Sequence, residues 1–309
     1  MNRRRHASAG FALPIELLLT MAAGLVIALL MRENITTRLA VQRHVESYRA
    51  HHERTGLQEI IGRWMATSGS REGIGTRLDD DGLAFTVEFG GAAEGDRLAV
   101  YFFDAQGTVL RDVTRLTGKP RQTARGIVST LEALLVERGI DPREHDAGEP
   151  AWRVQAQRVW GGPWFRVQGE LAVSVNAARR EVLEAVAQAV LESESDARRF
   201  LDALEDLREE EDGVLGPNDI TVAAGRASLR GNARDLRAAF TARPELWGVL
   251  VELRRSSRAV RDGAEPVTRW ASLLEVSESR RDLYDRSSPF LAWERLEPGP
   301  DGPSESGGG

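Results

Sequence analysis

Apolar residues gather in one long run near the N-terminus. From Phe11 to Met31 the polar residues are Glu16 and Thr20, and the run has about the 20 residues that an α-helix needs to cross a hydrocarbon core. The arginines at 3–5 precede it, so the positive-inside rule places the N-terminus in the cytoplasm and the bulk of the chain in the periplasm. The run ends in "IALLMREN" and lacks the small-x-small cleavage site of a secretory signal. We expect this segment to stay in the mature protein.

The helical pattern continues after the apolar run. Apolar residues recur at helical spacing: Ile35, Leu39, Val45 and Tyr48, then Leu57, Ile60, Ile61 and Trp64. One helix from Phe11 to about Met65 is therefore predicted. The polar stretch 49–55 and Gly56 interrupt the apolar stripe, which favours a kink or local melting there. "ATSGSREGIGTRLDDDG", which follows, is typical of a loop.

The next segments alternate apolar and polar residues with the period of strands. "AFTVEF" (84–89) is a predicted strand, and "RLAVYFF" (97–103) and "TVLRDV" (108–113) flank "DAQG" as a predicted hairpin. A helix is expected at 127–138, ended by Gly139 and Pro142. "WRVQAQRVW" (152–160) and "WFRVQGELAVSV" (164–175) are predicted strands around a "GGP" turn. These elements indicate an α+β head.

Residues 176–220 are predicted to form an inserted helical subdomain. Asn176 is placed to cap a first helix with Val182, Leu183, Val186 and Val190 on one face. Ser193 and Asp196 form a capping-box pattern before a second helix, so the two make a hairpin. After the insert, "NARDLRAAFTAR" (232–243) is a predicted helix. "LWGVLVELRRSS" (246–257) and "PVTRWASLLEV" (266–276) are strands expected to complete the sheet begun before the insert.

The predicted organisation has seven parts. They are a leader at 1–10, a transmembrane helix at 11–31, the extracytoplasmic part of that helix at 32–66, a first part of the α+β head at 67–175, the insert at 176–220, a second part of the head at 221–297, and a Gly, Pro and Ser tail at 298–309 that is expected to be disordered.

Charge and composition narrow the chemistry. The 309-residue chain carries a formal charge of −6, which gives no general attraction to nucleic acid, so no nucleic-acid partner is expected. The helical hairpin has the outline of a DNA-binding unit, but its acidic end at 205–212 repels phosphate. The chain has no cysteine, which excludes disulfides and thiolate sites. Its five histidines lie in the leader or in polar settings and are expected to be solvated.

Catalytic motifs are not found in the sequence. It lacks a G-x-S-x-G elbow, a P-loop, an H-E-x-x-H pair and a dinucleotide fingerprint. We therefore expect that the protein is not an enzyme and needs no organic cofactor. The acidic loops offer oxygen ligands that suit calcium. The candidate calcium ligands are Asp79, Asp80, Asp81, Asp212 and Asp219.

The N-terminal segment resembles the class III signal of type IV pilins and pseudopilins. A basic leader ends in Gly10, and Phe11, Ala12 and Leu13 open the apolar run, with a glutamate in the first turns. The resemblance implies cleavage by prepilin peptidase between Gly10 and Phe11, methylation of the new N-terminus at Phe11, and retention of the helix. It also implies that Glu16 pairs with the N-terminal ammonium of a neighbouring subunit in the membrane. The family's glutamate is the fifth mature residue, whereas Glu16 is the sixth.

The insert resembles that of the type II secretion minor pseudopilin K family. "VSVNAARREVL" (173–183) is similar to the strand-to-helix junction of that family, and "GPND" (216–219) to the exit of its insert. The resemblance implies a pilin-like fold and an inner-membrane, single-pass protein at the tip of a periplasmic pseudopilus. There it initiates or caps assembly and aids protein export across the outer membrane.

The same resemblance implies the partners. They are other minor pseudopilins, the major pseudopilin, prepilin peptidase, the inner-membrane secretion platform and an exoprotein substrate. Two alternatives stay open at this point: a minor pilin of a type IV pilus, which shares the leader and the long helix, and a single-pass periplasmic sensor or enzyme with an uncleaved anchor.

Overall fold

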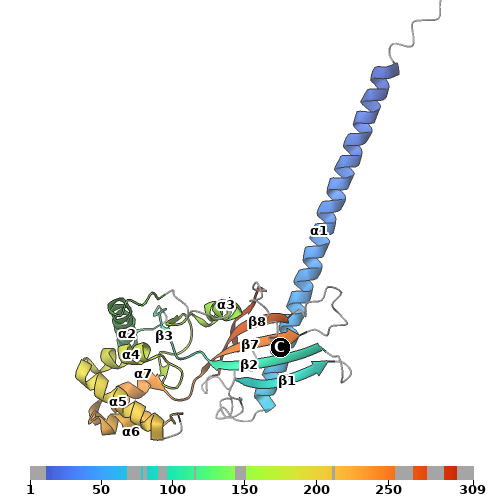
Figure 1. Ribbon diagram of the computed structural model, residues 1–309. Helices are drawn as coiled ribbons and strands as arrows, with labels where there is room; N and C mark the ends of the chain where they lie inside the picture. The colour runs from blue at the N-terminus through green and yellow to red at the C-terminus, as the bar shows by residue number, and fades with distance from the viewer. Residues whose placement is uncertain are drawn as a thin grey trace, which may run out of the picture. The chain divides into compact units, whose positions relative to one another are not determined.

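The chain forms two compact units, Met1–Thr67 and Ser68–Gly309. The computed structural model describes residues 12–67, 78, 82–89, 96–114, 116–142, 151–210, 213–254, 267–276 and 289–297. The first unit is the helix α1, Ala12–Thr67 (Figure 1). It continues through Gly56, so the single long helix is confirmed and the predicted local melting is wrong. The leader at 1–10 and the tail at 298–309 lie outside the described residues.

A five-stranded antiparallel sheet organises the second unit. Its order is β1-β2-β7-β8-β9. The strands are β1 (Leu83–Phe89), β2 (Asp96–Asp104), β7 (Leu246–Arg254), β8 (Val267–Glu275) and β9 (Phe290–Arg295). β2 pairs with β7 along its length, with Val100 opposite Val251. The prediction that strands after the insert complete the earlier sheet is confirmed, and so is the α+β class.

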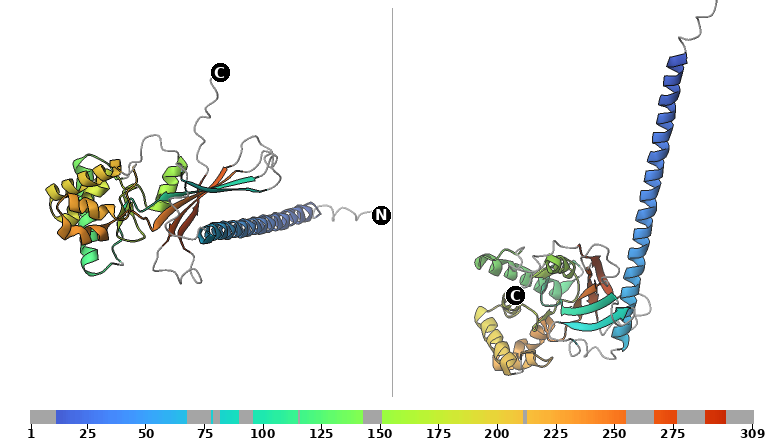
Figure 2. Two further views of the ribbon diagram at one scale, coloured as in Figure 1. Left: turned by 90° about the horizontal axis from the view of Figure 1, so that it is seen from below. Right: turned by 45° about the vertical axis from the view of Figure 1, so that its right-hand side comes forward.

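The segment between β2 and β7 contains most of the helices. These are α2 (Gly118–Glu137), α3 (Ala151–Trp160), α4 (Arg180–Leu191), α5 (Glu194–Glu210), α6 (Asp219–Arg226), the short helix η2 (Arg230–Asn232) and α7 (Ala233–Ala239). Two pairs of short parallel strands accompany them, β3 (Val109–Leu110) with β4 (Phe165–Arg166) and β5 (Val173–Ser174) with β6 (Phe240–Thr241). Figures 1 and 2 show α2 and α4–α7 beyond the ends of the long strands, whereas α3 lies by the sheet.

The helices α2 and α4–α7 share one apolar core. Phe200 of α5 and Phe240 of β6 are buried at its centre, with their ring centroids 5.5 Å apart. Arg138 at the end of α2 forms ion pairs with Glu181 and Glu184 of α4, which fasten these two helices on the outside. The predicted α4–α5 hairpin is present, and this helical core extends beyond residues 176–220 in both directions. We call this group of helices, with β3–β6, the helical insert.

The hydroxyl of Ser193 supports the start of α5. Ser193 Oγ accepts a hydrogen bond from the backbone N–H of Asp196 at 3.3 Å. A side-chain acceptor at this position satisfies one of the amides that a helix leaves free at its N-terminus. The predicted capping role of Ser193 is therefore confirmed.

The predicted strand at 152–160 is a helix, α3. Its residues satisfy both periods, because Trp152, Ala156, Val159 and Trp160 also fall at i, i+4, i+7 and i+8. The helix packs on the sheet through these residues, against Leu250 and Ala271 among others. Trp160 Nε1 donates a hydrogen bond to the carbonyl oxygen of Ser272, 2.9 Å away. Packing against the sheet therefore explains why this segment forms a helix and not a strand.

The predicted hairpin across 104–107 does not form. β2 pairs with β7 on one side and β1 on the other, so no edge is left for residues 108–113. Val109 and Leu110 instead pair in parallel with β4. The "DAQG" turn directs the chain out of the sheet.

One further prediction about the insert is wrong, and the helix predicted after it is confirmed as α7 (Ala233–Ala239) but is shorter than expected. Asn176 does not cap α4, which begins after Arg179 without a side-chain cap. The side-chain amide of Asn176 instead contacts a distant segment. Its Nδ2 donates to the Leu215 carbonyl at 3.0 Å, and its Oδ1 accepts from the Leu215 N–H at 2.9 Å. The helix predicted at 232–243 ends at Ala239, because Phe240 becomes extended and pairs with Val173.

Gly248 tests the contact between α3 and the sheet. A Cβ built on Gly248 lies 2.9 Å from two ring carbons of Trp160, so we expect Gly248→Ala to lower the free energy of unfolding by about 1–3 kcal/mol through overpacking. The measurement is urea denaturation of the detergent-solubilised protein. Gly231→Ala is the matched control because a Cβ there meets no atom within 4 Å. Equal stability of the two variants would contradict the close packing of Trp160 on the strand.

Candidate functional site

The first part of α1 is apolar around its whole circumference. Its large apolar side chains are exposed by more than half, including Leu17, Leu18, Leu19, Met21, Leu25, Ile27, Leu29, Leu30 and Met31. Exposed apolar area of this extent marks a membrane or protein contact, since water gives it no favourable partner. Among the described residues, the stretch Glu16–Met65 contains the one helix that is long and apolar enough to cross a membrane.

Two polar residues interrupt this apolar surface. Thr20 Oγ1 donates within the helix, 2.9 Å from the Glu16 carbonyl oxygen and 3.0 Å from that of Leu17. The hydroxyl is therefore satisfied without water, as a helix in hydrocarbon requires. Glu16 is exposed, and no described residue forms an ion pair with its carboxylate. The carboxyl group is therefore open to a donor from another molecule.

Gln106 joins the sheet to the helical insert. It lies in the turn after β2 and is 1% exposed. Its Nε2 donates to the Ala172 carbonyl at 2.8 Å, and its Oε1 accepts from the Glu245 N–H at 2.7 Å. Its backbone carbonyl accepts from Ser174 N–H at 3.0 Å. One side chain thus ties together the exit from β2, the start of β5 and the entry to β7.

An acid and an arginine are placed beside this junction. Asp104 Oδ1 accepts the Gln106 backbone N–H at 2.8 Å. Burial raises the pKa of Asp104 to about 6, against the opposing effects of the Ser174 side chain, of this hydrogen bond and of the Arg166 charge. Arg166 is fully buried and donates to the carbonyl oxygens of Glu170 and Ala172. Burial lowers the pKa of Arg166 to about 10, so it stays charged at neutral pH.

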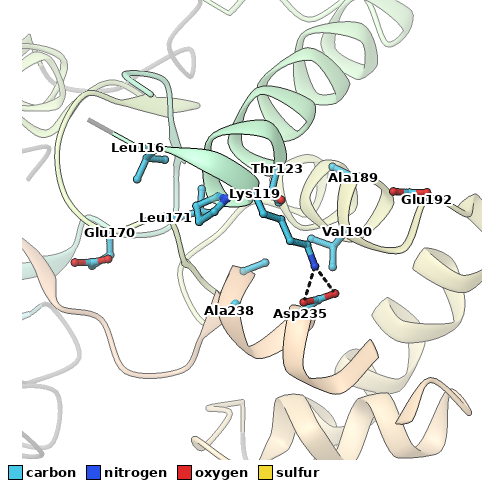
Figure 3. Close-up of a pocket in the computed structure, with 12 residues that line it drawn as sticks. Leu116, Lys119, Thr123, Glu170, Leu171, Ala189, Val190, Glu192, Asp235 and Ala238 are labelled. Carbon is cyan, nitrogen blue, oxygen red and sulfur yellow. Dashed lines mark hydrogen bonds and ion pairs between the residues drawn. The ribbon is translucent and has the colours of Figure 1, made fainter. Parts of the chain in front are cut away.

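A groove opens between α2, α4 and α7, with a volume of about 440 Å³ (Figure 3). Its apolar lining comes from Leu116, Pro120, Leu171, Ala189, Val190 and Ala238. Lys119 from α2 reaches toward α7, where its Nζ lies 3.1 Å from Asp235 Oδ2. Glu170 and Glu192 lie at the groove as well. We refer to this site as the α2–α4–α7 groove.

The carboxylate of Glu192 is presented by an unusual backbone. Glu192 ends α4 with a left-handed φ of 54° and ψ of 19°. Glycine is the residue that adopts this conformation without cost, and another residue loses roughly 1–2 kcal/mol there. The chain therefore keeps a strained, exposed acid at the rim of the groove.

Few of the predicted site residues are among those that the structure describes. Gly10, Phe11, Asp79, Asp80, Asp81 and Asp212 lie outside the described residues. Asp219 is described, and its Oδ2 accepts the Gly216 N–H at 2.6 Å at the start of α6. Among the described residues there is no group of three or more His, Asp or Glu side chains that could hold a metal. Calcium binding stays a prediction.

The sequence did not indicate the junction or the groove. Gln106 lies in a four-residue turn whose letters favour a hairpin, and Asp104 and Arg166 are 62 positions apart in strand-like segments. The groove is assembled from four separate segments of the chain. One local signal pointed to the rim of the groove: Glu192, and not the glycine usual at a helix end, follows the last apolar residue of α4.

No family model matches the chain, and no curated protein matches it. The structure is similar to a chain in the crystal structure of the GspK-GspI-GspJ complex from the enterotoxigenic Escherichia coli type 2 secretion system. The alignment covers 79% of this chain and 100% of that chain, with a TM-score of 0.37 and 13% identity.

The pKa of Asp104 gives a pH test of the junction. Its pKa rises from 3.8 to about 6 on folding, so protonated Asp104 favours the folded state. This contribution is complete below about pH 4 and is lost as the pH rises through 6, an effect on the order of 1–3 kcal/mol. Asp104→Asn keeps an acceptor for Gln106 and should remove this part of the pH dependence. The measurement is the unfolding free energy of both proteins between pH 4 and 7, and identical slopes would contradict a buried, titrating Asp104.

Proposed function

We propose that the chain is a membrane-anchored subunit of a filament built from helices like α1. The observation that carries this proposal is the apolar surface of α1 between Glu16 and Met31, exposed on all sides. A plain anchor is served by such a helix in lipid, but a carboxylate within the apolar run is unfavourable there, with a cost of up to about 3 kcal/mol at the centre of the bilayer. A neighbouring subunit with a positive charge removes that cost. The free carboxylate of Glu16 therefore favours assembly over simple anchoring.

More specifically, we propose a minor pseudopilin of a type II secretion system, at the tip of the periplasmic pseudopilus. The leader and the insert motifs of the sequence support this assignment. The helical insert supports it physically, since it is attached between the neighbouring strands β2 and β7 and lies beyond the ends of the strands. Such a bulky addition to the head would hinder a further subunit from joining above it. The protein then starts or caps the filament and acts by binding.

The proposed cycle begins with cleavage after Gly10 by prepilin peptidase and methylation of Phe11. The apolar helix holds the protein in the inner membrane, with the head in the periplasm. Extraction into the filament replaces lipid around α1 with the helices of other minor pseudopilins and of the major pseudopilin, at the secretion platform. The head is then free to meet exoprotein substrate.

Glu16→Gln tests the assembly role. The substitution removes the charge and lowers the cost of keeping the helix in lipid, so we expect the protein to remain membrane-bound. The amount of pseudopilin that co-purifies with it should fall at least about tenfold, as expected when a buried ion pair is broken. The measurement is quantitative co-purification from detergent-solubilised native membranes. Glu33→Gln, two residues past the apolar run on the same helix, is the matched control and should change nothing. Full co-purification with Glu16→Gln would contradict the pairing.

A further inference from the structure

We infer that the α2–α4–α7 groove is a docking site for a peptide segment of another protein that carries an aliphatic side chain beside arginine or lysine. This inference concerns a site in the helical insert, and it does not depend on the assembly role of α1. Its basis is the combination of an apolar lining with an excess of negative charge in one concavity.

The shape and lining of the groove suit aliphatic side chains. Its volume of about 440 Å³ lies in the range of roughly 300–1,000 Å³ that is typical of ligand sites. The alanines Ala189 and Ala238 leave this space open, because a larger side chain at either position would occupy it (Figure 3). Leu116, Leu171 and Val190 supply partly exposed apolar surface that an aliphatic side chain would remove from water.

The charges around the lining select a basic segment. Glu170, Glu192 and Asp235 lie at the groove with one cation of the lining, Lys119, whose ammonium is already bound to Asp235. The charge of the buried Arg166 acts on Glu170 from outside the lining, so Glu192 is the acid with the least compensation. No described residue forms an ion pair with Glu170 or Glu192, and both are exposed. An acidic ligand would be repelled, and a purely apolar one would cover these carboxylates without pairing them, which is unfavourable. A segment with arginine or lysine beside an aliphatic side chain pairs these carboxylates and fills the apolar part of the groove.

The backbone at Glu192 supports a binding role for the rim. Folding alone would favour glycine at this left-handed position. A strained residue that persists at the edge of a concavity points to a use for its side chain. The use consistent with its surroundings is to offer a carboxylate to a cation entering the groove.

The test uses the full-length protein in detergent and a defined peptide. The probe is Gly-Leu-Leu-Arg-Arg-Gly with blocked ends and a neutral fluorophore, followed by anisotropy, with protein-free micelles as background. We expect saturable binding that weakens at least about tenfold when both arginines become glutamate, and at least about fivefold when both leucines become glycine. Lack of saturable binding at 1 mM peptide, or equal binding of the glutamate peptide, would overturn the inference.

Two sets of variants locate the site. Ala238→Phe fills the groove from an exposed position and should weaken binding at least about tenfold, while Ala133→Phe, on the exposed side of α2 outside the groove, should leave it unchanged. The double variant Glu170→Gln with Glu192→Gln should weaken binding about threefold at low salt, with a smaller difference at high salt. Its control is Glu137→Gln with Glu209→Gln, which removes the same charge elsewhere. Unchanged binding by both groove variants would place the peptide outside the groove and overturn the inference.

Discussion

The pairing of β2 with β7 is the constraint on which the second unit depends. These strands are neighbours in the sheet, yet the whole helical insert and α3 lie between them in the chain. The point of departure and the point of return must therefore be held together. Gln106 does this with one buried side chain, which reaches both the strand after the insert and the strand inside it. The insert is consequently fixed at its base, and its groove keeps a defined place on the head.

The apolar surface of α1 sets a second constraint, which acts on the environment of the protein instead of its fold. A helix with exposed leucines on all sides is stable in lipid or among similar helices. In the proposed function the same surface serves both states in turn, and Glu16 distinguishes them because it gains a partner in the filament. The head then contributes a helical insert with a concave, acidic and partly apolar surface. Anchoring and assembly are thus both assigned to α1, and recognition is assigned to the helical insert.

The sequence predicted correctly those elements whose apolar residues fit either the helix period or the strand period, but not both, and whose structural partners are close in the chain. The long helix, the strand β1, the β7–β8 pair and the α4–α5 hairpin are of this kind. It failed at 152–160, where the residues satisfy both a strand and a helix, and at 104–113, where β7 arrives from 140 residues away to take the place of the predicted partner. Asn176 was assigned a local role, but its partner is 39 residues away. The junction and the groove share this property, since each is made by long-range contacts that no local pattern records.

The central claim is that α1 belongs to a processed filament subunit, and the most direct measurement is the intact mass and N-terminal sequence of the protein from its native membrane. The account predicts a chain that starts at Phe11 and carries one additional methyl group. A chain that starts at Met1 would contradict it and indicate a simple membrane anchor. A chain that starts after about residue 31 would contradict it as well, because the apolar segment would then be a removed signal and the head a free periplasmic protein.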